Sequence, residues 1–199
     1  MDINKNVNNL IEIPTEHYQE LFAKADPLEM SSRTGIEFSD GKFKFRVLNE
    51  DKTLSWPNAD DECFKPKDRI LFMRYLLEGK AVGFTTEFAA YKEFPGGELY
   101  NKPFTGRCIY RMLGSYGKNP DAFIKACEYY GGHRVKSTGI QYEFEFIHNL
   151  FLRFILWEGD EEFAPNMQIL FSRNFEETFS SEDRVVVCEY LIGRMQSLK

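Results

Sequence analysis

Two parts of the chain alternate apolar and polar residues with a period of two. Residues 42–47 do so directly after the turn-forming pair Asp40-Gly41, and residues 141–146 do so with glutamine and glutamate at the polar positions. Successive side chains of a β-strand point to opposite faces, so one face of each segment is expected against a core. Both segments are therefore predicted to be half-buried strands.

Further strands are predicted from runs that are apolar at nearly every position. Residues 150–157 form the longest such run, interrupted by Arg153, and this is typical of a central strand covered on both faces. Residues 167–171 are expected beside it as an antiparallel neighbour. Residues 54–56 are expected to pair with 42–47, and residues 88–94 are expected to form a short separate strand.

Helices are predicted where apolar residues recur at helical spacing between capping residues. The expected helices begin at the capping residue Thr15, at Pro66 (ending at Gly79), near Phe104 (to Tyr116), at Pro120 (to Tyr130), and after Ser180 or Ser181. A short turn is expected from Pro27 to near Gly35.

Strands that follow one another, with helices between and after them, predict an α+β domain in which helices pack on a mainly antiparallel sheet. With 199 residues and 43% apolar content, the chain can bury one sizeable core. We expect residues 1–14 to form a flexible N-terminal tail and residues 15–199 to form a single domain. The 19 Phe and 10 Tyr predict that aromatic side chains dominate its core.

Composition excludes several classes of function. The 25 basic and 31 acidic residues give a net charge of -6, and no basic stripe indicates contact with nucleic acid. The longest apolar run is far short of the roughly 20 residues that span a bilayer. Cys63, Cys108, Cys127 and Cys188 are dispersed, so neither a zinc nor an iron–sulfur site is indicated. We expect a cytoplasmic protein with four free thiols, no membrane contact and no cofactor.

The segment from Trp157 to Phe163 carries four carboxylates in five positions, Glu158, Asp160, Glu161 and Glu162. Carboxylate oxygens suit Ca²⁺ or Mg²⁺, although the spacing fits no EF-hand. Crowded carboxylates also repel, so one of them could keep a proton and act as an acid. The same loop could bind a basic partner or a ligand. It could also be a solvated loop with both aromatic rings packed beneath it.

Two further expectations concern this acidic segment. Trp157 ends an apolar strand, so we expect its ring to be largely buried and to anchor the loop. Neighbours in an extended backbone point to opposite sides, so only Glu158, Asp160 and Glu162 are expected to share a side.

A second candidate site contains Lys92, Glu93, Gly96 and Gly97. A glycine pair after a short strand allows the backbone to approach a ligand closely, and the two charged side chains could contact it. The alternative is ordinary turn chemistry around Pro95. We expect this segment and the acidic segment to form one surface, which would bind a protein or small-molecule partner.

Motifs of nucleophilic catalysis are missing from the sequence. No G-x-S-x-G occurs, and the three histidines lie apart. Gly114-Ser115-Tyr116-Gly117-Lys118 is too short for a phosphate loop and is interpreted as a helix end. A non-enzymatic accessory protein is therefore favoured over the alternative, a metal-assisted hydrolase that uses Glu158, Asp160 and Glu162. The sequence leaves the oligomeric state open.

Several segments together resemble an uncharacterised prokaryotic family, domain of unknown function 3786. They are Asp26-Pro27 with Arg33-Thr34-Gly35, Phe94-Pro95-Gly96-Gly97 with Tyr100 and Phe104, Trp157 to Phe163 with residues 168–171, and Ser181-Glu182-Asp183. The resemblance implies an accessory role in anaerobic metabolism and no known catalytic residue. Some relatives carry a cysteine-rich segment that this chain lacks, which counts against a direct redox role.

Overall fold

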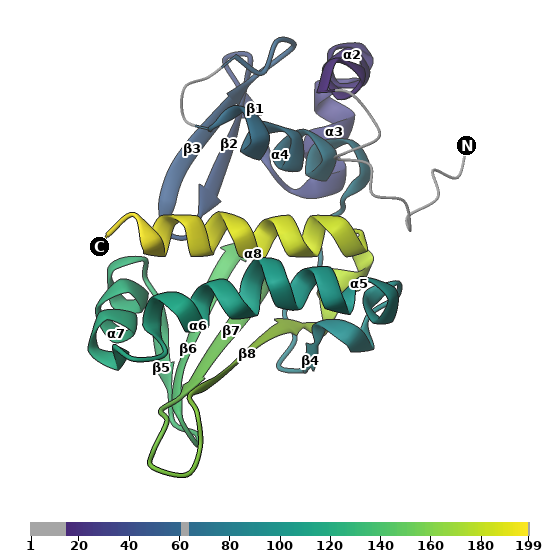
Figure 1. Ribbon diagram of the computed structural model, residues 1–199. Helices are drawn as coiled ribbons and strands as arrows, with labels where there is room; N and C mark the ends of the chain where they lie inside the picture. Colours follow the sequence, from purple (N-terminus) through teal and green to yellow (C-terminus); the bar gives the residue numbers. More distant parts are fainter. Residues whose placement is uncertain (1–14, 61–63, 199) are drawn as a thin grey trace.

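Helix α8 (Ser181–Gln196) runs through the middle of the molecule, between a smaller and a larger layer (Figure 1). The structure is a computed structural model that describes residues 15–60 and 64–198. The expected tail, residues 1–14, and Cys63 lie outside the described residues. Two antiparallel sheets with helices packed on them make up the fold, so the predicted α+β class is confirmed.

The smaller layer combines helices with a three-stranded antiparallel sheet of order β1-β2-β3. Its elements are α2 (Thr15–Lys24), α3 (Pro27–Thr34), β1 (Glu37–Ser39), β2 (Lys42–Val47), β3 (Glu50–Ser55) and α4 (Pro66–Glu78). Local signals fix the ends of α3: the Asp26 carboxylate accepts a hydrogen bond from Leu28 N at 2.8 Å, and Gly35 takes a left-handed φ of 73°. Helices α2 and α4 match the predictions closely, and the short turn expected from Pro27 is a helix of 8 residues.

The alternating segment 42–47 is a strand with every second side chain buried, as predicted. Its neighbours were predicted less well. The turn Asp40-Gly41 joins it to β1, which was not expected, and its partner β3 begins at Glu50 rather than at Leu54. Both strands lie at sheet edges and carry mostly polar residues, so their sequences lack the apolar pattern of a strand.

The larger layer contains a five-stranded antiparallel sheet of order β4-β8-β7-β6-β5. Its strands are β4 (Phe88–Ala90), β5 (His133–Val135), β6 (Ile140–Ile147), β7 (Leu150–Trp157) and β8 (Asn166–Ser172). Two 3₁₀ turns follow β4 and β8, η1 (Tyr91–Glu93) and η3 (Arg173–Glu177). The strand expected over residues 88–94 therefore ends early, because the Glu93 carboxylate accepts a hydrogen bond from Ala90 N at 2.6 Å and holds the turn.

Strand β7 is central, as predicted, but only one of its faces is fully covered. Leu152, Phe154 and Leu156 are buried beneath the helices, whereas Phe151, Arg153 and Trp157 on the opposite face are half-buried. Arg153 lies with its guanidinium carbon 3.6 Å from the centre of the Phe88 ring and pairs with Glu143 at 2.7 Å. The expectation that both faces of this strand are covered was wrong. Large apolar side chains that are only half-buried cannot be distinguished in the sequence from fully buried ones.

The covered face of the sheet packs against one long helix and a shorter one (Figure 1). The long helix consists of α5 (Gly97–Phe104), the π-helical segment η2 (Thr105–Ile109) and α6 (Tyr110–Tyr116); α7 (Pro120–Tyr129) follows. The helix expected from Phe104 thus begins at Gly97. Proline normally interrupts a helix, yet Pro103 lies inside this one, two residues before the wider π turn begins at Thr105.

Aromatic rings join the two layers into one core around α8. The ring of Phe72 in α4 lies 6.0 Å from that of Phe146 in β6 and 5.7 Å from that of Tyr190 in α8. Cys108, Cys127 and Cys188 are buried free thiols in this interior. Across residues 15–60 and 64–198, no helix combines the length and the apolar character that crossing a membrane requires.

Candidate functional site

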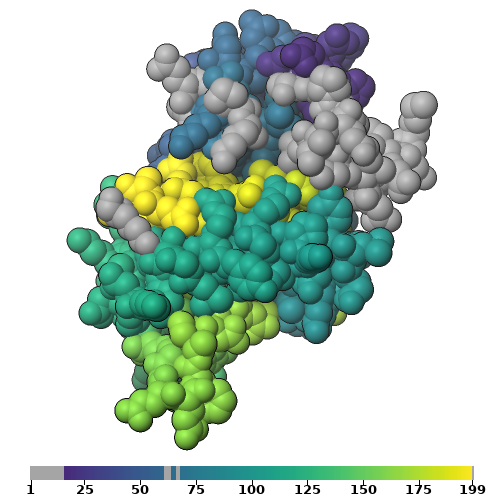
Figure 2. Space-filling view, viewed as in Figure 1, coloured from purple at the N-terminus to yellow at the C-terminus, as the bar shows by residue number. Residues whose placement is uncertain are grey.

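The acidic loop, residues 158–165, connects β7 to β8 and extends beyond the rest of the molecule. Figure 1 shows it at the free end of the sheet, and Figure 2 shows the same segment as a projection below the helices. Glu158, Asp160, Glu161 and Glu162 are all exposed there. The hairpin thus carries the carboxylates away from the core into solvent.

Asp160 gives the acidic loop a fixed shape. Its carboxylate accepts hydrogen bonds from the backbone N–H groups of Glu162 at 2.9 Å and Phe163 at 2.7 Å, while its own N–H donates to Phe163 O at 2.9 Å. The two bonds from Phe163 and Glu162 hold the pKa of this carboxyl below its usual range. Asp160 is therefore a structural carboxylate and is not the member of the cluster that would keep a proton.

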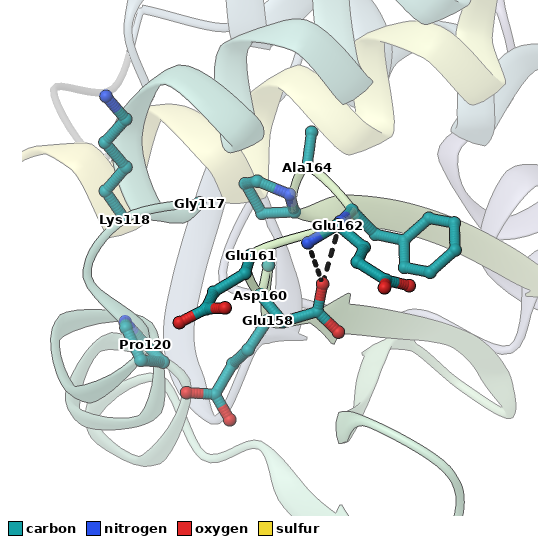
Figure 3. Close-up of a pocket in the computed structure, with 11 residues that line it drawn as sticks. Gly117, Lys118, Pro120, Glu158, Asp160, Glu161, Glu162 and Ala164 are labelled. Carbon is teal, nitrogen blue, oxygen red and sulfur yellow. Dashed lines mark hydrogen bonds between the residues drawn. The ribbon is translucent and has the colours of Figure 1, made fainter.

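The remaining carboxylates point in different directions. In Figure 3, Glu158 and Glu161 lie on the side of the loop that faces Pro120, whereas Glu162 lies on the opposite side. The expectation that Glu158, Asp160 and Glu162 share a side was wrong because the loop is bent and closed by Asp160 rather than extended. No group of three His, Cys, Asp or Glu side chains within the described ranges is arranged to hold a metal ion.

The two aromatic residues beside the loop are less buried than the sequence suggested. Trp157 is half-buried on the outer face of the sheet, and its ring packs over Gly139, where an added Cβ would lie 3.0 Å from Trp157 Cδ1. Phe163 is 69% exposed. Trp157 therefore supports the base of the hairpin from one side, and Phe163 lies in solvent beside the glutamates.

A hollow of about 460 Å³ lies between the acidic loop and the end of α6. Its wall opposite the loop is formed by Gly117, Lys118 and Pro120. The loop approaches this wall closely, since an added Cβ at Gly117 would lie 3.3 Å from Pro165 Cγ. The Lys118 amine points away from the carboxylates (Figure 3). The hollow is thus open and mainly acidic.

The second candidate segment lies elsewhere and organises the start of α5. Glu93 holds the η1 turn, and Gly96 adopts a left-handed φ of 72° at the N-cap of the helix. An added Cβ at Gly97 would lie 2.1 Å from Tyr91 O, so only glycine fits there. Lys92 is exposed and lines a separate hollow with Asn101, Phe104 and Gln168 among its walls.

The two hollows have no lining residue in common. The residues proposed from the sequence therefore fall into two groups, one in the acidic loop and one at the start of α5. Sequence reasoning did not place Lys118 and Pro120 beside the acidic loop. Their approach depends on the packing of α6 and α7 on the sheet, and no local pattern reports it.

Comparison with known proteins gives one match. The family model described as Domain of unknown function (DUF3786) matches residues 26–194. No curated protein and no solved structure matches the chain.

Proposed function

Given that the chain belongs to the family Domain of unknown function (DUF3786), we propose that it is a non-enzymatic binding protein whose acidic loop docks a basic segment of a partner protein. The observation that carries this proposal is the shape of the loop. Asp160 uses its carboxylate to close the loop, which leaves three exposed glutamates on two sides of it, Glu158 and Glu161 on one side and Glu162 on the other.

Diverging carboxylates suit several separate cations of a partner better than one metal ion. A hard cation such as Ca²⁺ needs six to eight oxygen ligands that converge on one point. A basic peptide instead carries amines several ångströms apart, and each can meet its own glutamate. The fixed loop lowers the entropy that binding would cost, and the exposed ring of Phe163 offers apolar contact beside the charges.

The setting we propose is the cytoplasm of an anaerobic prokaryote, where the protein would serve as an accessory component of metabolism. The family resemblance supports the anaerobic setting. The three described cysteines support a reducing compartment, because each is a free thiol inside the core.

The test is a calorimetric titration of the protein with a short oligolysine peptide, which measures the affinity of the complex. Glu158→Gln/Glu161→Gln/Glu162→Gln removes three loop charges and keeps the Asp160 hydrogen bonds. We expect it to weaken binding about tenfold, with the remaining affinity falling further as NaCl screens the other charges. The control removes three exposed glutamates far from the loop, Glu16→Gln/Glu20→Gln/Glu29→Gln. Equal loss in both variants would mean that only net charge attracts the peptide, and the proposal would fail.

A melt with divalent cations tests the alternative, a metal-assisted hydrolase. We expect millimolar Ca²⁺ or Mg²⁺ to change the melting temperature no more than NaCl of the same ionic strength. A metal that binds only the folded state would instead stabilise it by about 2.7 kcal/mol at a hundredfold excess over Kd. Such a rise, lost in the triple glutamine variant, would replace the partner proposal with the metal-dependent one.

A further inference from the structure

The long helix α5-η2-α6 leaves one face open to solvent across the front of the molecule (Figure 1). Two large apolar side chains on it are strongly exposed, Leu99 at 84% and Tyr110 at 66%. Every fourth residue along the helix and its end is also exposed: Glu98, Lys102, Gly106, Tyr110, Gly114 and Lys118. We call these six residues the helix stripe.

The π-helical segment keeps the helix stripe on one side. In a regular α-helix of 3.6 residues per turn, steps of four residues drift by about 40° each, so a stripe of this length would wind around the helix. The turn at Thr105–Ile109 is wider and contains more residues, which offsets part of the drift. The four central positions, from Lys102 to Gly114, consequently stay close to one row, and Glu98 and Lys118 flank that row at its two ends.

Two glycines in the helix stripe have no role inside the monomer. An added Cβ at Gly106 or Gly114 would meet no atom within 4 Å, and neither residue has a positive φ. Glycine in a helix is less stable than alanine, because it loses more conformational freedom on folding. The absence of a side chain at these two positions therefore allows another molecule to approach the helix closely from outside.

We propose that the helix stripe is the contact surface of a homodimer, in which two copies pack antiparallel about a two-fold axis beside Cys108. This arrangement places Glu98 opposite Lys118 of the other copy, Lys102 opposite Gly114, and Tyr110 opposite Gly106. Each bulky side chain thus faces a glycine, and each terminal acid faces a base. A surface patch that complements itself in this way is what a two-fold interface requires.

The charges at the two ends of the helix stripe favour a second copy of the chain as the binding partner, and they favour an antiparallel orientation of its helix. A parallel pairing would place Glu98 against Glu98, Lys118 against Lys118 and Tyr110 against Tyr110. The antiparallel pairing replaces the two like-charge contacts with two ion pairs, and it also opposes the two helix dipoles. Neither Glu98 nor Lys118 forms a salt bridge within the described part of the monomer, and the Lys118 amine points away from the acidic loop (Figure 3). Exposed ion pairs contribute little affinity but fix the register.

The experiment is sedimentation equilibrium of the whole protein from micromolar to millimolar concentration. We expect the wild type to reach twice its monomer mass of 23.3 kDa. Glu98→Lys should weaken the dimer at least about tenfold, because it turns both ion pairs into repulsions. Lys118→Glu should do the same, and the double reversal Glu98→Lys/Lys118→Glu should restore it. Glu16→Lys is the matched control, since Glu16 is also an exposed glutamate in the first turn of a helix.

A glycine variant separates an interface from an effect on folding. Gly106→Leu fills the space for the partner's Tyr110, and its Cβ would meet no atom within 4 Å, so it should abolish the dimer without lowering the melting temperature of the monomer. A wild type that stays monomeric at millimolar concentration would overturn the proposal. So would a dimer that survives both single charge reversals. Neither outcome affects the proposal for the acidic loop, whose test uses different residues.

Discussion

At the scale of single residues, the cysteines illustrate how burial decides chemistry. The Cys108 thiol in η2 donates a hydrogen bond to Val185 O of α8 at 3.8 Å, and Cys188 of α8 is fully buried in the same interior. Burial raises the pKa of the Cys188 and Cys127 thiols well above the ordinary value. Because the thiolate is the reactive form, these thiols are expected to be inert.

We predict that Cys108, Cys127 and Cys188 resist iodoacetamide in the native protein and react fully once guanidinium unfolds it. Peptide mass spectrometry reads out each site separately. Freshly prepared protein handled without reductant should also contain no disulfide between Cys108 and Cys188. Labelling of any of the three faster than global unfolding would show that the core opens locally, and a disulfide would count against a reducing compartment.

At the scale of an element, the first turn of α8 combines a helix cap with buried charge. Asp183 accepts a hydrogen bond from Ser180 Oγ at 2.6 Å and pairs with Arg74 Nη2 of α4 at 3.0 Å. Both charged side chains are buried. Glu182 pairs with Arg107 of η2 at 2.7 Å. The start of this helix is therefore tied to the helices of both layers.

We predict that Asp183→Ala lowers the free energy of unfolding by about 3–5 kcal/mol, the range for breaking a buried ion pair, because buried Arg74 then keeps only its longer 3.6 Å contact with Glu78. Ser180→Ala should cost only about 1 kcal/mol, since it removes the cap but leaves Arg74 paired. Urea unfolding followed by circular dichroism measures both. Equal stability of the two variants would contradict this prediction. It would mean that water solvates Arg74 once Asp183 is removed, and that the ion pair does not hold the two layers together.

At the scale of the whole molecule, buried tyrosines connect stability to alkaline pH. Burial raises the pKa of Tyr75 in α4 and Tyr190 in α8 to about 12, and it also raises the pKa of Tyr91 in η1. All three rings are at most 5% exposed. In the unfolded chain the same phenols ionise near pH 10. The folded state therefore binds their protons more tightly than the unfolded state does.

We predict that the contribution of these protons to stability is complete below pH 10 and is lost as pH rises towards 12. Each phenol should lower the free energy of unfolding by up to about 1.4 kcal/mol per pH unit in that window. Urea melts at a series of pH values, combined with the ultraviolet absorbance of tyrosinate, measure this. Tyr190→Phe should flatten the slope. Full tyrosinate absorbance in protein that is still folded would contradict the prediction.

The sequence by itself determined the elements whose signals are local. The positions of helices α3, α4 and α7 were predicted because Pro27, Pro66 and Asn119 mark their starts, and those of β2 and β6 because their side chains alternate. The acidic loop could be located as well, since strongly apolar strands flank it on both sides. In each case neighbours along the chain carry the energy that selects the structure.

Only the tertiary structure decided what depends on partners far away in sequence. The polar strands β1 and β3, the half-exposed face of β7 and the burial of Asp183 against Arg74 could not be predicted, because each side chain's environment is supplied by another element. The same holds for Lys118 beside the acidic loop. Periodicity reports which side of an element avoids water, whereas packing decides what that side meets.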